Sequence, residues 1–101
     1  MSGVLGLLGL GLRGGNLAVG VEAVRKELQG SRLGCVVVAS DASPRAVDRV
    51  VRLAEARRVP LIRGPRADDL GAQLGRPPVM AVGVRDRGLA QGVLRAASTE
   101  E

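Results

Sequence analysis

Three glycines near the start of the chain have the spacing of a phosphate-binding loop. Gly9, Gly11 and Gly14 fit the pattern G-x-G-x-x-G, whose backbone N–H groups approach the pyrophosphate of a dinucleotide. That chemistry needs a β-strand before the first glycine, whereas residues 3–8 are rich in Leu and Gly and favour a helix. It also needs two mononucleotide-binding halves, for which 101 residues are too few. A small nucleotide-binding domain that uses this glycine-rich loop is therefore kept only as an alternative.

The end of the same stretch, Gly14-Gly15-Asn16, offers a second kind of anion site. A helix is expected to start near Gly20, so the backbone N–H groups of this loop would lie beside a helix N-terminus, which attracts phosphate. Asn16 adds a side-chain donor and an acceptor. An ordinary turn explains the same residues, because Gly adopts a positive φ and Asn tolerates one.

The remaining residue types argue against catalysis and metal binding. The chain has no His, and its single Cys, Cys35, lies in an apolar run where a small buried side chain is expected. Without His no base is present to activate a thiol, and one Cys is too few for a structural zinc site. Asp41 and Ser43 fit a turn and a helix cap better than an acid–base pair. We expect no enzymatic activity, no cofactor and no metal.

The charge of the chain favours a polyanionic partner. Lys and Arg number 15 against 10 Asp and Glu, and Lys26 is the only Lys. Arg binds phosphate and guanine through a planar pair of donors, so nucleic acid is the expected class of partner. A GC-rich or thermophilic genome would enrich Arg without any such function. Phe, Tyr and Trp are absent, which excludes a surface that stacks bases on aromatic rings.

The N-terminal segment is apolar, but it lacks the pattern of a membrane or export signal. Residues 1–15 have no charged start and no small-x-small cleavage site with a polar mature chain after it, and they are too few to span a bilayer. We expect a cytoplasmic protein without membrane contact.

The positions of apolar residues and of helix-ending residues predict alternating helices and strands. Short apolar runs predict strands at 34–39, 59–62 and 79–84. Helices are expected at 3–13, 20–29 and 66–75, after Ser43-Pro44 and after Asp86. Residues 1–97 then form one α/β domain with helices on both faces of a small sheet, and residues 98–101 form a flexible acidic tail.

Two of these helices carry further spacing signals. The helix after Pro44 is expected to bury one face, formed by Val47, Val50, Val51 and Ala54. In the helix at 20–29, Glu22 and Lys26 have the spacing of an i,i+4 ion pair.

Several motifs, taken in order, resemble those of a known family. They are Leu7-Leu8-Gly9-Leu10, Arg13-Gly14-Gly15-Asn16-Leu17, Gly20, the run VVVASDASPR at 36–45, Val59-Pro60-Leu61, Leu70-Gly71 with Leu74-Gly75, Ala81-Val82-Gly83-Val84, and Asp86. As a set they resemble the superfamily of large-subunit ribosomal proteins seven-Ae and thirty-e, and most of all its small bacterial YlxQ-type members. The resemblance extends from about residue 5 to about residue 94.

The resemblance implies a three-layer α/β/α sandwich with a small four-stranded mixed sheet. It also implies binding to structured RNA, a kink-turn or a related internal loop. In that superfamily a Gly-x-Asn loop and the helix after it enter the RNA groove, and the matching position here is Asn16, beside Gly14 and Gly15. A second contact of the superfamily is the loop before the last strand, which here is Arg76-Pro77-Pro78-Val79.

Two side chains of the superfamily's RNA-reading pattern are absent at the matching positions. The kink-turn binders carry Glu directly after the Asn and Lys four residues after it, where this chain has Leu17 and Gly20. Candidates to replace the missing cation are Arg13, Arg45, Arg63 and Arg76. Arg13 and Arg76 come first, because they flank the two loops that the superfamily uses.

The sequence thus predicts a non-enzymatic RNA-binding protein associated with the ribosome or the translation machinery. The predicted RNA-binding residues are Arg13, Gly14, Gly15, Asn16, Leu17, Gly20, Arg45, Arg76, Pro77 and Pro78. A protein-interaction adaptor that has lost kink-turn specificity is a further alternative, favoured by the missing Glu and Lys.

Overall fold

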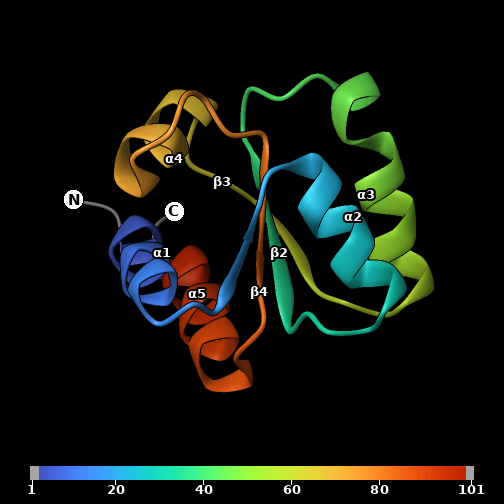
Figure 1. Cartoon of the computed structure of the whole chain (residues 1–101), viewed down its shortest axis with the longest axis horizontal. Coiled ribbons are helices and arrows are strands. Elements are labelled where there is room, and N and C mark those ends of the chain that lie inside the picture. The colour runs from blue at the N-terminus through green and yellow to red at the C-terminus, as the bar shows by residue number, and fades with distance from the viewer. Residues whose placement is uncertain (1–2, 100–101) are drawn as a thin grey trace.

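Four strands form one mixed sheet in a computed structural model that describes residues 3–99. The strands are β1 (Leu17–Val19), β2 (Cys35–Ala39), β3 (Leu61–Gly64) and β4 (Ala81–Val84), in the order β1-β4-β2-β3. β4 is antiparallel to both β1 and β2, and β2 is parallel to β3. Three strands therefore run in one direction, and their carboxyl ends meet at one edge of the sheet, at the top of Figure 1.

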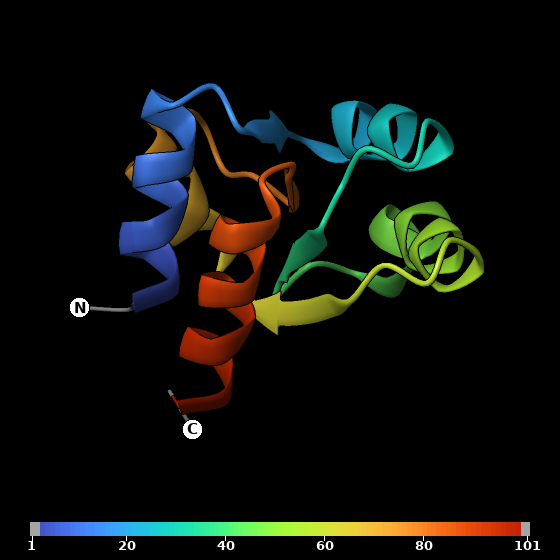
Figure 2. The same cartoon turned by 90° about the horizontal axis from the view of Figure 1, so that it is seen from below.

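Helices cover both faces of this sheet. The helices α1 (Gly3–Arg13), α4 (Ala67–Leu74) and α5 (Arg87–Thr99) lie on one face, and α2 (Val21–Gln29) and α3 (Pro44–Ala56) lie on the other (Figures 1 and 2). The predicted three-layer α/β/α sandwich with a four-stranded mixed sheet is confirmed.

The core is built from aliphatic side chains. All five residues of β2 are fully buried, as expected of a strand with helices on both sides. Val47, Val50 and Ala54 form the buried stripe of α3, while Val51 is only half-buried. No polar or charged side chain of residues 3–99 is buried. The fold therefore carries no buried charge that would need a partner.

Side chains cap two helices as the sequence predicts. The Ser43 hydroxyl accepts the N–H of Ala46 at 3.2 Å, and Pro44 is the first residue of α3. The Asp86 carboxylate accepts the N–H of Leu89 at 2.8 Å at the start of α5. Each bond satisfies a backbone donor that the first turn of a helix leaves unpaired.

The structure differs from the sequence prediction at several element ends. The edge strand β1 was not predicted, because three residues are too few to show an alternating pattern. β3 and β4 each begin two residues later than predicted. The N–H of Val59 donates instead to the carbonyl of Ala54 at the end of α3, and the N–H of Val79 donates to the carbonyl of Ala67. α5 continues through Ser98 and Thr99, and the rest of the predicted tail lies outside the described residues.

Cys35 is fully buried at the start of β2, as the sequence predicts, and burial raises the pKa of its thiol to about 12. A protonated, inaccessible thiol is a poor nucleophile. We therefore expect no reaction of the folded protein with a thiol reagent at pH 8, and full reaction in denaturant, measured by absorbance of the released chromophore. Rapid labelling of the folded protein would contradict the placement of Cys35.

Candidate functional site

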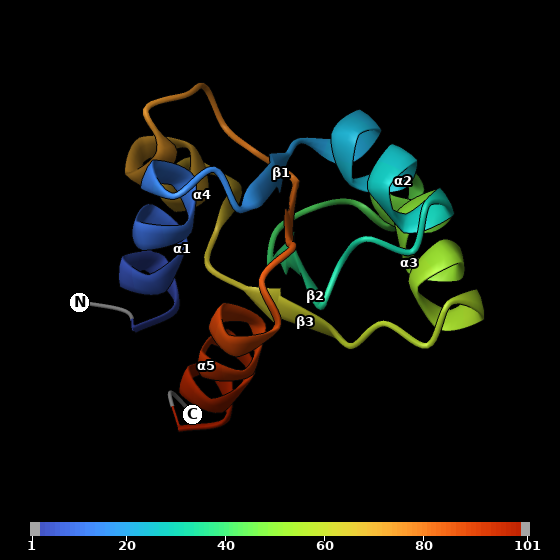
Figure 3. The same cartoon turned by 60° about the horizontal axis from the view of Figure 1, so that its bottom comes forward.

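One end of the sheet gathers the starts of three helices. β1 leads into α2, β2 into α3 and β3 into α4, and these three strands end at the same edge (Figures 1 and 3). The N-terminus of a helix carries a partial positive charge and free backbone N–H groups. In open α/β sheets, this is the edge at which ligands are bound. Within residues 3–99 no group of acidic, His or Cys side chains is arranged to hold a metal.

The three helix starts differ in how their N–H groups are satisfied. The Ser43 side chain caps α3, and the Asp41 carboxylate accepts the N–H of Ala67 at the start of α4, at 2.8 Å. That hydrogen bond, more than the nearby Arg66 guanidinium, lowers the pKa of the Asp41 carboxyl. α2 instead has Gly20 at its N-cap, with φ 97°, and no side chain caps it. The start of α2 is therefore the one open to an external anion.

A groove of about 340 Å³ lies beside the start of α2. Val19, Gly20 and Val21 form one side, and the segment from Arg76 to Met80 forms the other. The N–H of Gly20 donates to the carbonyl of Ala81 at 2.8 Å, which holds the two sides together. The orange segment that precedes β4 passes beside the end of β1 in Figure 3. We call this feature the Gly20 groove.

The far wall of the Gly20 groove packs directly against the backbone of α4. Gly71 leaves no room for a side chain, because a Cβ there would collide with the carbonyl oxygens of Pro77 and Arg76. The N–H of Arg76 also donates to the carbonyl of Gly71 at 2.8 Å. The segment 76–80 is thus fixed by backbone contacts, and its Arg76, Pro77 and Pro78 side chains face solvent.

Several charged side chains lie at this end of the sheet, and one of them lines the Gly20 groove. Arg45 lies in the first turn of α3 and is exposed, and Arg76 lines the groove. Neither forms an ion pair within residues 3–99, whereas Arg66 lies 3.6 Å from the Asp41 carboxylate. Arg45 and Arg76 are therefore cations at this end that no ion pair within residues 3–99 compensates.

The predicted glycine loop lies at the opposite end of the sheet. β1 separates Asn16 from Gly20, a distance of roughly 13 Å at about 3.3 Å per residue. The N–H groups of Gly14, Gly15 and Asn16 donate to carbonyls of α1, and so they are not free for phosphate. The prediction that this loop lies beside the next helix start is wrong, because the short strand was not foreseen. The same bonds remove the basis for a nucleotide site in the glycine-rich loop.

The other predicted site residues divide between the two ends. Gly20, Arg76, Pro77 and Pro78 are brought together at the Gly20 groove. Arg45 lies at the start of α3, at the same end of the sheet but outside the lining of the groove, and Arg13 lies with the glycine loop. Leu17 is only 8% exposed, so its side chain belongs to the core and not to an interface. Arg63 is exposed on β3 and does not line the groove.

Three groove residues were missed from the sequence: Val19, Val21 and Met80. Met80 is an apolar side chain that is 37% exposed, two residues after an exposed Pro-Pro pair. An apolar residue between a stiff loop and a buried strand was the available signal.

Comparison with protein families decides the relationship of the chain. The model of the Ribosomal protein L7Ae/L30e/S12e/Gadd45 family matches residues 4–93. The chain belongs to this family. Membership in the L7Ae/L30e/S12e/Gadd45 family confirms the resemblance at the level of the superfamily, while the closeness to YlxQ-type members stays a prediction.

Solved structures share the fold of this L7Ae/L30e/S12e/Gadd45 member. A protein of unknown function from Bacillus halodurans C is 24% identical, with a TM-score of 0.91 over 97% of this chain and 99% of that one. The 15.5kD RNA binding protein of Giardia lamblia is 19% identical, with a TM-score of 0.81 over 95% of this chain and 82% of that one. The curated proteins gave no match. Within residues 3–99 no helix is long and apolar enough to cross a membrane.

Proposed function

We propose that this chain is a non-enzymatic RNA-binding protein that holds structured RNA at the Gly20 groove. The observation that carries the proposal is the uncapped N-terminus of α2 beside a groove with an unpaired arginine. A net charge of +5, the family and the named RNA binder of the same fold support it.

The contacts to RNA follow from the chemistry of the groove. Phosphate oxygens would accept the N–H groups of the first turn of α2, and Arg76 and Arg45 would add charge-assisted hydrogen bonds. The apolar side chains of Val21 and Met80 would lie against a sugar or a base. Since the chain has no aromatic residue, phosphate contacts would dominate the affinity.

Placing the superfamily pattern at the true helix start changes which residues fill it. Counted from Gly20, the Asn position falls on Glu22, the Glu position on Ala23 and the Lys position on Lys26, the only Lys of the chain. Glu22 pairs with Arg25 at 3.0 Å and not with Lys26, contrary to the predicted i,i+4 pair. Within residues 3–99 Lys26 has no ion pair, so its ammonium group is available for a phosphate. We include Lys26 in the proposed interface.

The finer parts of the proposal concern the RNA and its setting. The preferred RNA is a kink-turn or a related internal loop, and the setting is the ribosome or the translation machinery in the cytoplasm. Glu22 and Ala23 differ from the Asn and Glu of the superfamily pattern. The preference for bent over straight RNA is therefore the first property to test.

We expect Arg76→Gln and Lys26→Gln each to weaken RNA binding about tenfold, because each removes one phosphate contact. Gel shifts over a salt series, with a kink-turn RNA and a straight duplex, measure this. Each variant should also reduce the slope of log affinity against log salt by about 1. Arg13→Gln is the matched control, since it removes the same charge at the opposite end of the sheet, and it should bind within about twofold of the wild type.

Three outcomes would contradict parts of the proposal. Equal, weak binding to both RNAs would remove the kink-turn preference. Equal losses of RNA affinity in Arg13→Gln and Arg76→Gln would show that the Gly20 groove is not the binding site. No binding at low salt would remove the RNA function and favour the adaptor, which a pull-down with and without nuclease then tests.

A further inference from the structure

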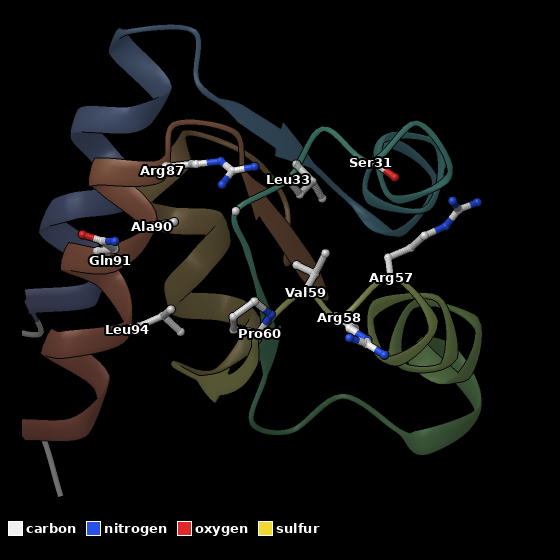
Figure 4. Close-up of a pocket in the computed structure, with 11 residues that line it drawn as sticks. Ser31, Leu33, Arg57, Arg58, Val59, Pro60, Arg87, Ala90, Gln91 and Leu94 are labelled. Atoms are coloured by element: carbon white, nitrogen blue, oxygen red, sulfur yellow. The ribbon is translucent and has the colours of Figure 1, made fainter.

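A second cleft lies at the end of the sheet away from the Gly20 groove. Its volume is about 430 Å³, within the range of small-molecule sites. The segments before β2 and before β3 form one side, and α5 forms the other (Figure 4). Figure 4 shows Arg87 reaching from α5 toward Leu33, while Arg57 and Arg58 lie on the far side where α3 ends, with their guanidinium groups turned away from Arg87. We call this feature the arginine cleft.

The lining of the arginine cleft combines an apolar floor with a basic rim. Leu33, Val59, Pro60 and Leu94 supply aliphatic surface, and no acidic residue lines the cleft. Gln91 adds an amide that both donates and accepts hydrogen bonds. A concave apolar surface with a few polar groups is typical of a ligand site.

The three arginines of the rim have no ion-pair partner in the part of the chain that the structure describes. The ion pairs within residues 3–99 use Arg25, Arg32, Arg52, Arg66 and Arg85, and none uses Arg57, Arg58 or Arg87. The nearest acid in sequence to Arg87 is Asp86, whose carboxylate is engaged as the cap of α5. Three uncompensated guanidinium groups around a concave surface attract an anion.

Helix dipoles do not account for this cluster. An arginine at a helix C-terminus is favourable whatever its use, which would explain Arg57 and Arg58 at the end of α3. Arg87, however, is the first residue of α5, where the dipole disfavours a cation. The guanidinium of Arg87 therefore lies at this cleft although the dipole of α5 disfavours a positive charge there.

The backbone of the cleft is also unusual. Ser31 and Arg58, with φ of 55° and 57°, are the non-glycine residues of the described chain in the left-handed region, and both line this cleft. Each follows the end of a helix at a position where glycine is the usual residue. Both positions thus keep a polar side chain at the cleft in a conformation that glycine adopts more easily.

We propose that the arginine cleft binds a nucleoside monophosphate, either free or as one unit of an RNA strand. Arg87 would hold the phosphate, and Arg57 and Arg58 would turn toward it on binding, since the forked donors of arginine match its oxygens. The sugar and base would lie on the aliphatic floor. This site is separate from the Gly20 groove and does not depend on the function proposed there.

The test is an NMR titration of ¹⁵N-labelled full-length protein with separate probes. The probes are the common 5′-mononucleotides, adenosine, pyrophosphate and a short single-stranded RNA. We expect a mononucleotide or the RNA to shift the backbone signals of Ser31, Arg58 and Ala90, and adenosine to leave them unchanged. Shifts from mononucleotides assign the free nucleotide as the source, and shifts from the RNA alone assign the strand. Signals of Gly20 and Met80 report the other groove separately.

Three variants distinguish the arginine cleft from general charge. Arg58→Gly relieves the positive φ, so it should keep or raise the melting temperature while weakening binding about tenfold. Arg87→Gln should weaken binding to a similar extent. Arg95→Gln removes the same charge from α5 outside the cleft and should bind within about twofold of the wild type.

The proposal is overturned if neither the mononucleotides nor the RNA move the cleft signals, or if Arg58→Gly and Arg87→Gln bind like the wild type. Pyrophosphate binding as tightly as the mononucleotides would overturn the nucleotide assignment, because the apolar floor would then contribute nothing.

Discussion

Gly71→Ala is expected to lower the free energy of unfolding by about 1–3 kcal/mol, as overpacking of a closed contact does. The new Cβ would collide with the carbonyl oxygens of Pro77 and Arg76, which are backbone atoms and cannot turn aside as a flexible side chain can. The segment 76–80 would have to move away from α4. Because this segment is the far wall of the Gly20 groove, RNA affinity should fall together with stability. Urea unfolding and the gel shift measure the two effects on the same sample.

Gly6→Ala is the matched control for that substitution. Gly6 also lies within a helix, but a Cβ there would meet no atom within 4 Å. Alanine should therefore stabilise α1 by up to about 1 kcal/mol and leave RNA binding unchanged. If Gly6→Ala lost as much stability as Gly71→Ala, the close approach of residues 76–77 to Gly71 would not be the cause of the loss in Gly71→Ala.

Arg85→Met is expected to cost about 1–3 kcal/mol of unfolding free energy, because it removes several charge-assisted hydrogen bonds at once. The Arg85 guanidinium donates to the Glu27 carboxylate at 2.6 Å and to the carbonyls of Gly15 and Leu17 at 2.9 and 3.0 Å. It thus ties the end of β4 to α2 and to the start of β1. Arg52→Met is the control, since its ion pair with Asp48 is exposed and should be worth less than about 1 kcal/mol.

The same contact makes stability depend on pH. The hydrogen bond from Arg85, more than its charge, holds the pKa of the Glu27 carboxyl below its ordinary value of 4.5. A carboxyl with a lowered folded pKa stabilises the protein above its unfolded pKa, and this contribution is lost as pH falls through the folded pKa. Wild-type stability should therefore fall below pH 4.5, and Arg85→Met should lose less over the same range in urea unfolding. Parallel curves for the two proteins would contradict the role given to Arg85.

Local signals were sufficient to predict most of the fold. The apolar run at 35–39 had to be a buried strand, and Ser43 and Asp86 marked helix starts because a side-chain oxygen is needed there. β1 was not predictable, because its three residues form a strand only through pairing with β4, far along the chain. The resemblance, and not the local pattern, predicted that the sheet has a fourth strand.

The candidate site was only partly predictable, for a related reason. Arg76, Pro77 and Pro78 were identified as a loop, but their contact with Gly20 exists only after β1 pairs with β4. Without that strand, the loop that ends at Asn16 was expected to lie beside the helix start at Gly20, and the superfamily pattern was placed on Asn16. Arg85 was missed entirely, because its Glu27 partner lies 58 residues away and neither side chain belongs to a motif.

The strand order has a consequence for how the molecule is made. In the sheet β1 pairs only with β4, although β1 is near the start of the chain and β4 near its end. During synthesis the first strand must therefore wait, unpaired, until Ala81–Val84 have been made. Both walls of the Gly20 groove come together at that step, so a nascent chain interrupted before it presents no groove. Formation of the Gly20 groove is thereby coupled to the synthesis of β4.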